Sequence, residues 1–75
     1  MPFGERVLIM RRRRDMTQRA LAQAASLNTN TIARVEQGNL KDLGGQSVAR
    51  LARALGCSAD YLLGLVEEDE EESAA

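Results

Sequence analysis

Apolar residues recur through the middle of the chain at the three- and four-residue spacing of amphipathic helices. Thr17 and Asn28 stand where N-capping residues are expected, and Gly38 follows the second apolar stripe, where a left-handed residue commonly ends a helix. The pattern predicts two short helices within residues 17–38, joined by a tight turn at residues 26–28. Their inward positions are Leu21, Ala22, Ala25, Ile32, Val35 and Glu36.

The same periodicity predicts three further helices. The first begins near Gly4 or Glu5 and runs to Arg14, and Asp15 ends it because aspartate tolerates a left-handed backbone better than most residues. The remaining elements are a loop over residues 39–45, a helix over 47–55 ended by Gly56, and a helix over 59–63 capped by Ser58. The inward residues of these helices are Phe3, Val7, Met10, Val48, Leu51, Ala52 and Leu55, with Tyr61, Leu62 and Leu63 available to close the core or to meet a second subunit.

The outward face of the helix before Gly38 differs from an ordinary solvent-exposed face. Such faces usually carry Glu and Lys in pairs four residues apart, whereas this one offers hydroxyls, amides and one guanidinium, which match base edges and phosphates. The pattern therefore indicates a helix-turn-helix whose second helix reads double-stranded DNA. The residues expected to contact bases are Thr29, Asn30, Ala33 and Arg34, with Ala33 able to meet a thymine methyl group.

The spacing of Thr17-Gln18, Leu21-Ala22, Ile32, Val35-Glu36 and Gly38 resembles the helix-turn-helix of Xre-type regulators, the Cro and phage-repressor family. Residues 51–63 are similar to the end of that family's fourth helix, its terminating glycine and its fifth helix, so the resemblance covers about residues 3–64. It implies an all-α, compact, five-helix lambda-repressor-like domain. Ser26 stands where the family favours glycine, so we expect a slightly strained or reshaped turn.

The resemblance also implies roles for residues around the reading helix. In the family the loop after that helix lies along the DNA backbone. The residues expected to contact the backbone are Thr17, Gln18, Asn28, Gln37, Asn39 and Lys41. Arg11 stands where the family has an arginine that pairs with the glutamate of the third helix, which implies a structural ion pair between Arg11 and Glu36; the alternative is a solvated Arg11. Residues 12–14 are three further arginines, expected to raise the local positive potential or to solvate the helix end.

Composition argues for a binding domain and against an enzyme. The 75 residues can hold one core; they include no histidine and a single cysteine, so a catalytic triad, a disulfide framework and a metal site are not expected, and no cofactor is expected. Cys57 is expected to be a small buried residue, with a redox sensor as the alternative. No apolar run has the length of a membrane span or a signal peptide, so a cytoplasmic protein is expected.

Charge is divided unevenly along the chain. The formal net charge is −1, yet residues 1–66 carry ten basic against five acidic side chains, a net charge of +5, and residues 67–75 carry six acids and no base. A positive body favours association with phosphates. We therefore expect a DNA-binding domain over residues 1–66 and an acidic, disordered tail over residues 67–75, which either aids solubility or competes with DNA for the basic face.

Together these features predict a sequence-specific transcriptional regulator of a prokaryote or phage, expected to be a repressor that acts as a homodimer on a palindromic operator. Two copies would read half-sites about 34 Å apart. An alternative is a protein-interaction module, such as an antitoxin-like or accessory regulator, favoured by Leu8 and Ile9 because they fall off the predicted inward face. RNA binding is disfavoured, since one Tyr and one Phe provide almost no surface for stacking unpaired bases.

Overall fold

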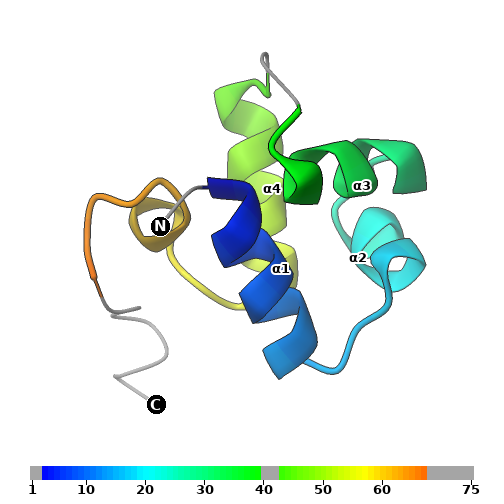
Figure 1. Cartoon of the computed structure of the whole chain (residues 1–75), viewed down its shortest axis with the longest axis horizontal. Helices are drawn as coiled ribbons and strands as arrows, with labels where there is room; N and C mark the ends of the chain where they lie inside the picture. Colours follow the sequence, from blue (N-terminus) through cyan, green and yellow to red (C-terminus); the bar gives the residue numbers. More distant parts are fainter. Residues whose placement is uncertain (1–2, 40–42, 68–75) are drawn as a thin grey trace.

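Five segments of the chain are helical in the computed structural model, which describes residues 3–39 and 43–67. They are α1 (Phe3–Arg13), α2 (Gln18–Ala24), α3 (Thr29–Gln37), α4 (Gly45–Leu55) and α5 (Ala59–Leu62) (Figure 1). No strand occurs in these two ranges, so the predicted all-α, five-helix architecture is confirmed. None of the helices in the described ranges combines the length and the apolar character that crossing a membrane requires.

Two helices begin with the predicted side-chain caps. Thr17 Oγ1 accepts a hydrogen bond from the Ala20 N–H at 3.0 Å, and Ser58 Oγ accepts one from the Tyr61 N–H at 3.0 Å. Each bond satisfies a backbone donor that the first turn of a helix leaves free. Asn28 occupies the N-cap position of α3, but its side chain makes no capping hydrogen bond, so the predicted cap is wrong in that respect.

The ends of three helices follow from residues with a left-handed backbone. Gly38 ends α3 with φ 78°, Gly56 ends α4 with φ 66°, and Asp15 adopts φ 57° two residues after the last residue of α1. Each of these terminators was predicted. Glycine adopts this conformation without the steric penalty that a Cβ imposes, which is why it is common beyond helix ends.

Three predicted boundaries need correction. Helix α1 ends at Arg13, one residue early, and α4 begins at Gly45 rather than Ser47, because the turn before Val48 closes with a hydrogen bond from the Val48 N–H to the Gly44 carbonyl at 3.1 Å. Helix α5 ends at Leu62, and Leu63 follows with 53% of its surface exposed. Of the three residues expected to close the core or meet a subunit, Tyr61 and Leu62 are buried and Leu63 is not.

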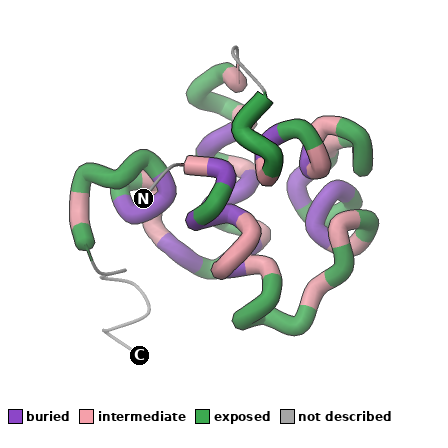
Figure 2. The backbone as a smooth tube through the Cα atoms, viewed as in Figure 1, coloured by how far each residue is buried: buried purple, intermediate pink, exposed green. Residues whose placement is uncertain are grey.

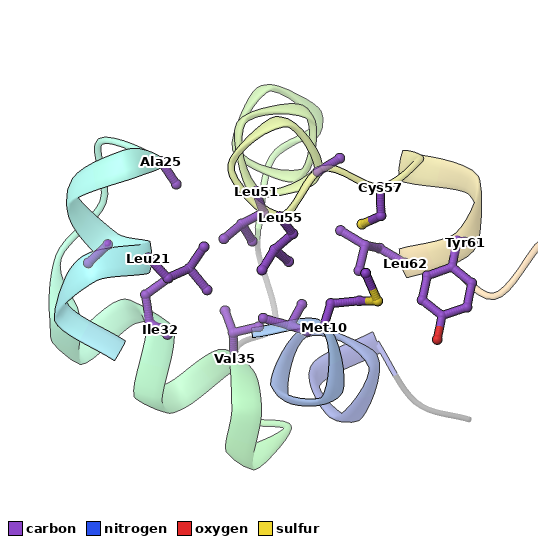
Figure 3. Close-up of a cluster of buried hydrophobic side chains, with 13 residues drawn as sticks. Met10, Leu21, Ala25, Ile32, Val35, Leu51, Leu55, Cys57, Tyr61 and Leu62 are labelled. Carbon is purple, nitrogen blue, oxygen red and sulfur yellow. The ribbon is translucent and has the colours of Figure 1, made fainter. Parts of the chain in front are cut away.

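The core lies where all five helices converge (Figures 2 and 3). Met10 of α1 lies near the centre of the cluster and is fully buried, as are Leu21, Ile32 and Leu51 from the next three helices. Cys57 is buried at the α5 end of the same cluster, as expected for a small apolar residue. Because burial of a large aliphatic side chain contributes about 1.5–3 kcal/mol, this shared cluster is what holds α2 and α3 against the rest of the domain.

Two buried residues of α1 were not predicted. A Cβ at Gly4 would lie 1.9 Å from the Val35 carbonyl oxygen, so only glycine permits α1 to pack this closely on α3. Arg6 is only 5% exposed: its Nη1 donates to the Tyr61 carbonyl at 2.8 Å and to the Val66 carbonyl at 3.0 Å, and its guanidinium carbon lies 4.6 Å from the centre of the Tyr61 ring. Arg6 thereby ties α1 to the segment that follows α5.

Arg14 likewise has a structural role that sequence reasoning missed. Its Nε donates to the Leu55 carbonyl at 2.7 Å, and its Nη2 donates to the Gly56 carbonyl at 3.2 Å. These are carbonyls at the C-terminus of α4, where a cation is favoured both by the free acceptors and by the helix dipole. The expectation that Arg14 only raises the local potential or solvates the helix end is therefore wrong.

Candidate nucleic-acid interface

A tight turn sets the angle between α2 and α3. Ser26 has φ 57°, so the residue that replaces the expected glycine does adopt a left-handed backbone. The Leu27 N–H donates to the Ala22 carbonyl at 2.8 Å and the Ser26 N–H to the Gln23 carbonyl at 3.2 Å, which closes the end of α2. Half-buried Leu27 then packs on the core, and α3 leaves across α2 (Figure 1).

Helix α3 is anchored on one side and open on the other. Ile32 is fully buried and Val35 is 3% exposed, whereas Asn30, Arg34 and Gln37 are exposed at positions that one side of a helix shares. The other two members of this outward face are exposed Thr29 and half-buried Ala33. The guanidinium of Arg34 makes no hydrogen bond or ion pair within residues 3–39 and 43–67, so it is available to an external partner.

Polar side chains flank both ends of this outward face. Thr17 and Asn28 are exposed, and the missing cap bond leaves the amide of Asn28 available. At the C-terminal end, Asn39 Nδ2 donates to Gln37 Oε1 at 3.4 Å, and both residues are exposed. Lys41 lies outside the described residues, as do positions 68–75 of the predicted acidic tail.

The carboxylate of Glu36 joins three helices beneath the outward face of α3. Arg11 Nε lies 2.6 Å from Glu36 Oε2 and Arg11 Nη2 lies 3.1 Å from Oε1, so the ion pair that the resemblance implied is present in bidentate form. The Glu36 hydrogen bond, opposed by desolvation, raises the pKa of Arg11 above its ordinary value. Gln18 Nε2 also donates to Glu36 Oε1, at 3.0 Å, and Arg11 Nη1 donates to the Met16 carbonyl at 2.9 Å.

Sequence reasoning missed the Gln18 contribution to this network. It placed Glu36 inward and Gln18 at the DNA backbone, without bringing the two together. Acceptor capacity was the available clue. The carboxylate of Glu36, predicted to face inward, can accept more hydrogen bonds than one arginine donates, and Gln18, the first residue of α2, carries an amide that can supply another. The network fixes the first turn of α2 and the last turn of α1 against α3, which sets the position of the outward face.

Comparison with known proteins defines the class. A sequence profile described as helix-turn-helix matches residues 8–62, and the chain therefore belongs to the helix-turn-helix family, among its Xre-type, phage-repressor-like members. It is a DNA-binding regulator of the repressor-like type. No curated protein matches the chain.

Solved structures agree with this membership. The P22 c2 repressor in complex with the synthetic operator 9T, in the presence of Tl⁺, is similar with a TM-score of 0.79 and 30% identity, covering 84% of this chain and 94% of that one. The solution structure of the DNA-binding domain of the same repressor gives a TM-score of 0.77 and 29% identity, covering 83% and 80%. The restriction-modification controller protein C.AhdI from Aeromonas hydrophila gives a TM-score of 0.76 and 26% identity, covering 81% and 91%.

Proposed function

We propose that the chain binds double-stranded DNA sequence-specifically through the outward face of α3 and represses transcription by occupying a promoter. The observation that carries this proposal is the two-sided character of α3, whose buried side holds the helix rigidly while Asn30, Arg34 and Gln37 remain exposed. The similar P22 c2 repressor was solved with a synthetic operator, which supports duplex DNA as the ligand. The proposed activity is binding alone, without catalysis, in the cytoplasm of a prokaryotic cell.

The proposed base contacts come from the exposed side of α3. Arg34 can donate two hydrogen bonds to guanine, and Asn30 can pair with the donor and acceptor of adenine. Thr29 and Ala33 complete this set, with Ala33 against a thymine methyl group. The proposed backbone contacts are Thr17, Gln18, Asn28, Gln37, Asn39 and Lys41.

The proposed working form is a homodimer on a palindromic operator. Leu63 is 53% exposed and Leu65 is 70% exposed, and together they are the exposed large apolar side chains of the described residues. Their segment is ordered by hydrogen bonds from the Leu65 N–H to the Asp60 carbonyl at 2.9 Å and from Arg6 to Val66 at 3.0 Å. Two leucines presented on an ordered segment support pairing with the same segment of a second copy, which would bring two α3 helices to adjacent half-sites.

The test is Arg34→Ala, assayed against a duplex selected from genomic fragments and against a scrambled duplex of the same length. A base contact predicts a loss of about 1–3 kcal/mol on the selected duplex and little change on the scrambled one. Arg53→Ala is the matched control, since Arg53 is an exposed arginine of α4 and belongs to neither proposed contact set. An equal loss on both duplexes would make Arg34 a phosphate contact, and a wild-type protein that does not distinguish the duplexes would contradict the proposed function.

A protein-interaction module stays the alternative proposal. The residues that favour it, Leu8 and Ile9, are half-buried in α1.

A further inference from the structure

The amide of Gln18 has only one chemically consistent orientation. A carboxylate accepts hydrogen bonds but cannot donate them, so the atom of Gln18 that faces Glu36 Oε1 at 3.0 Å must be the amide nitrogen. One of its two N–H groups is used in this bond. The second N–H, and the amide oxygen, make no hydrogen bond within residues 3–39 and 43–67.

Glu36 is itself held in place, which makes this orientation rigid. Its side chain is 6% exposed and receives both Nε and Nη2 of Arg11. Because an amide group is planar, fixing one N–H fixes the direction of the other. A glutamine side chain ordered before binding loses less conformational entropy when it meets a ligand than a freely rotating one does.

We propose that Glu36 is a positioning residue for DNA binding, whose carboxylate holds the Gln18 amide so that its second N–H is presented to a backbone phosphate. This inference rests on the proposed function, in which Gln18 contacts the DNA backbone. Glu36 thus acts on DNA through Gln18, in addition to pairing with Arg11. Since phosphates are common to all sequences, the effect is independent of base sequence.

A double-mutant cycle on DNA affinity separates this role from fold stability. Gln18→Ala in the wild-type background should weaken binding by about two- to tenfold, the size expected for one hydrogen bond, equally on selected and scrambled duplexes. In the Glu36→Gln background the side chain at position 36 can donate as well as accept, so it no longer forces one orientation on the Gln18 amide, and the same change should have little further effect. The cycle cancels the gain that Glu36→Gln produces simply by removing a negative charge near DNA.

Two controls accompany the cycle. Gln23→Ala changes an exposed glutamine of the same helix and should leave affinity unchanged. All four proteins of the cycle are compared at a temperature where circular dichroism shows each to be folded. Equal losses from Gln18→Ala in both backgrounds, or no loss in the wild type, would overturn the inference while leaving the base-reading test of Arg34 untouched.

A second measurement uses the wild-type protein and therefore does not depend on a folded Glu36 variant. Side-chain amide resonances of Gln18 and Gln23 are followed as scrambled duplex is added. The Gln18 resonances should shift far more than those of Gln23, and unmoved Gln18 resonances would overturn the inference.

Discussion

Gly4 of α1 lies directly against the backbone carbonyl of Val35 in α3, and a Cβ at position 4 would approach that oxygen to 1.9 Å. Carbonyl oxygens belong to the backbone and cannot swing aside as the end of a flexible side chain can. The contact therefore sets how closely α1 approaches the C-terminal half of α3.

Gly4→Ala should destabilise the domain by about 1–3 kcal/mol, because the clash outweighs the better helix propensity of alanine. Gly45→Ala is the matched control: Gly45 begins α4 and a Cβ there meets no atom within 4 Å, so its melting temperature should stay the same or rise slightly. Thermal denaturation followed by circular dichroism measures both. A Gly4→Ala protein as stable as the wild type would show that α1 can shift freely on α3.

Ser26→Gly should stabilise the domain by about 0.5–1 kcal/mol, because glycine relieves the left-handed strain at the cost of a more flexible unfolded chain. Ser26 is exposed with φ 57°, so no packing is lost. Ser47→Gly, the same change within α4, should instead lower stability. Urea denaturation of the three proteins gives the comparison, and a destabilised Ser26→Gly would mean that the hydroxyl matters more than the backbone.

Glu36→Ala should lower stability by about 2–4 kcal/mol, since it leaves the guanidinium of Arg11 largely buried and unmatched. The double variant Arg11→Ala with Glu36→Ala should lose less stability than the two single variants combined, and exposed Glu5→Ala should be nearly neutral. Additive losses would argue against a coupled pair.

The raised pKa of Arg11 means that its contribution to stability is complete below the ordinary arginine pKa and is lost only as pH rises beyond it. Arg11 should therefore cause no loss of stability in mildly alkaline buffer.

Arg6→Met should cost about 2–3 kcal/mol, because the carbonyls of Tyr61 and Val66 lose their charged donor while the apolar stem is retained. The variant should also loosen the segment after α5, in addition to lowering the free energy of unfolding of the whole protein. Hydrogen exchange at the Leu65 amide, which bonds to the Asp60 carbonyl at 2.9 Å, should accelerate. Arg53→Met, at an exposed position of α4, is the control for charge removal, and unchanged exchange at Leu65 would refute the tie between α1 and this segment.

Leu63→Ser combined with Leu65→Ser should weaken the proposed dimer by about 1–3 kcal/mol, given the partial burial available to two leucines. Binding to a duplex with two half-sites should fall, whereas binding to a single half-site should not. Ala49→Ser, an exposed apolar-to-polar change on α4, serves as the control. Analytical ultracentrifugation gives the mass of each protein: a variant as dimeric as a dimeric wild type would place the contact elsewhere, and a monomeric wild type would contradict the proposed dimer.

Local patterns in the sequence predicted most of the helices and most of their ends. The periodicity of Leu21 and Ile32 located α2 and α3, and the terminators Gly38 and Gly56 required only their own conformational freedom. The open face of α3 was also visible in the sequence, because facing outward is a property of one helix. The base and backbone contacts assigned to that face remain predictions.

The parts that were missed depend on residues distant in the chain. Arg6 bonds to residues 55 and 60 positions away, and Arg14 to carbonyls 41 and 42 positions away, separations at which no helical period carries information. For two of the missed residues, Arg6 and Gly4, the sequence did contain an indication of their role. Arg6 shares the inward face with Phe3 and Met10, and Gly4 is a glycine within a helix, which is unfavourable without a packing reason.

The hydrogen bonds from Arg6 to the carbonyls of Tyr61 and Val66 also affect the order in which the protein can fold during synthesis. Synthesis proceeds from the N-terminus, yet α1 packs on α3, α4 and α5, and its guanidinium anchor is completed only when Val66 has been added. Contacts of α1 with α3 can form once about half of the chain has been made, but its contacts with α4 and α5, and the Arg6 bond to Val66, wait for nearly all of the described residues. A chain that stops short of Val66 leaves the Arg6 guanidinium with one of its two carbonyl acceptors missing, so its first helix is held less firmly than in the finished protein.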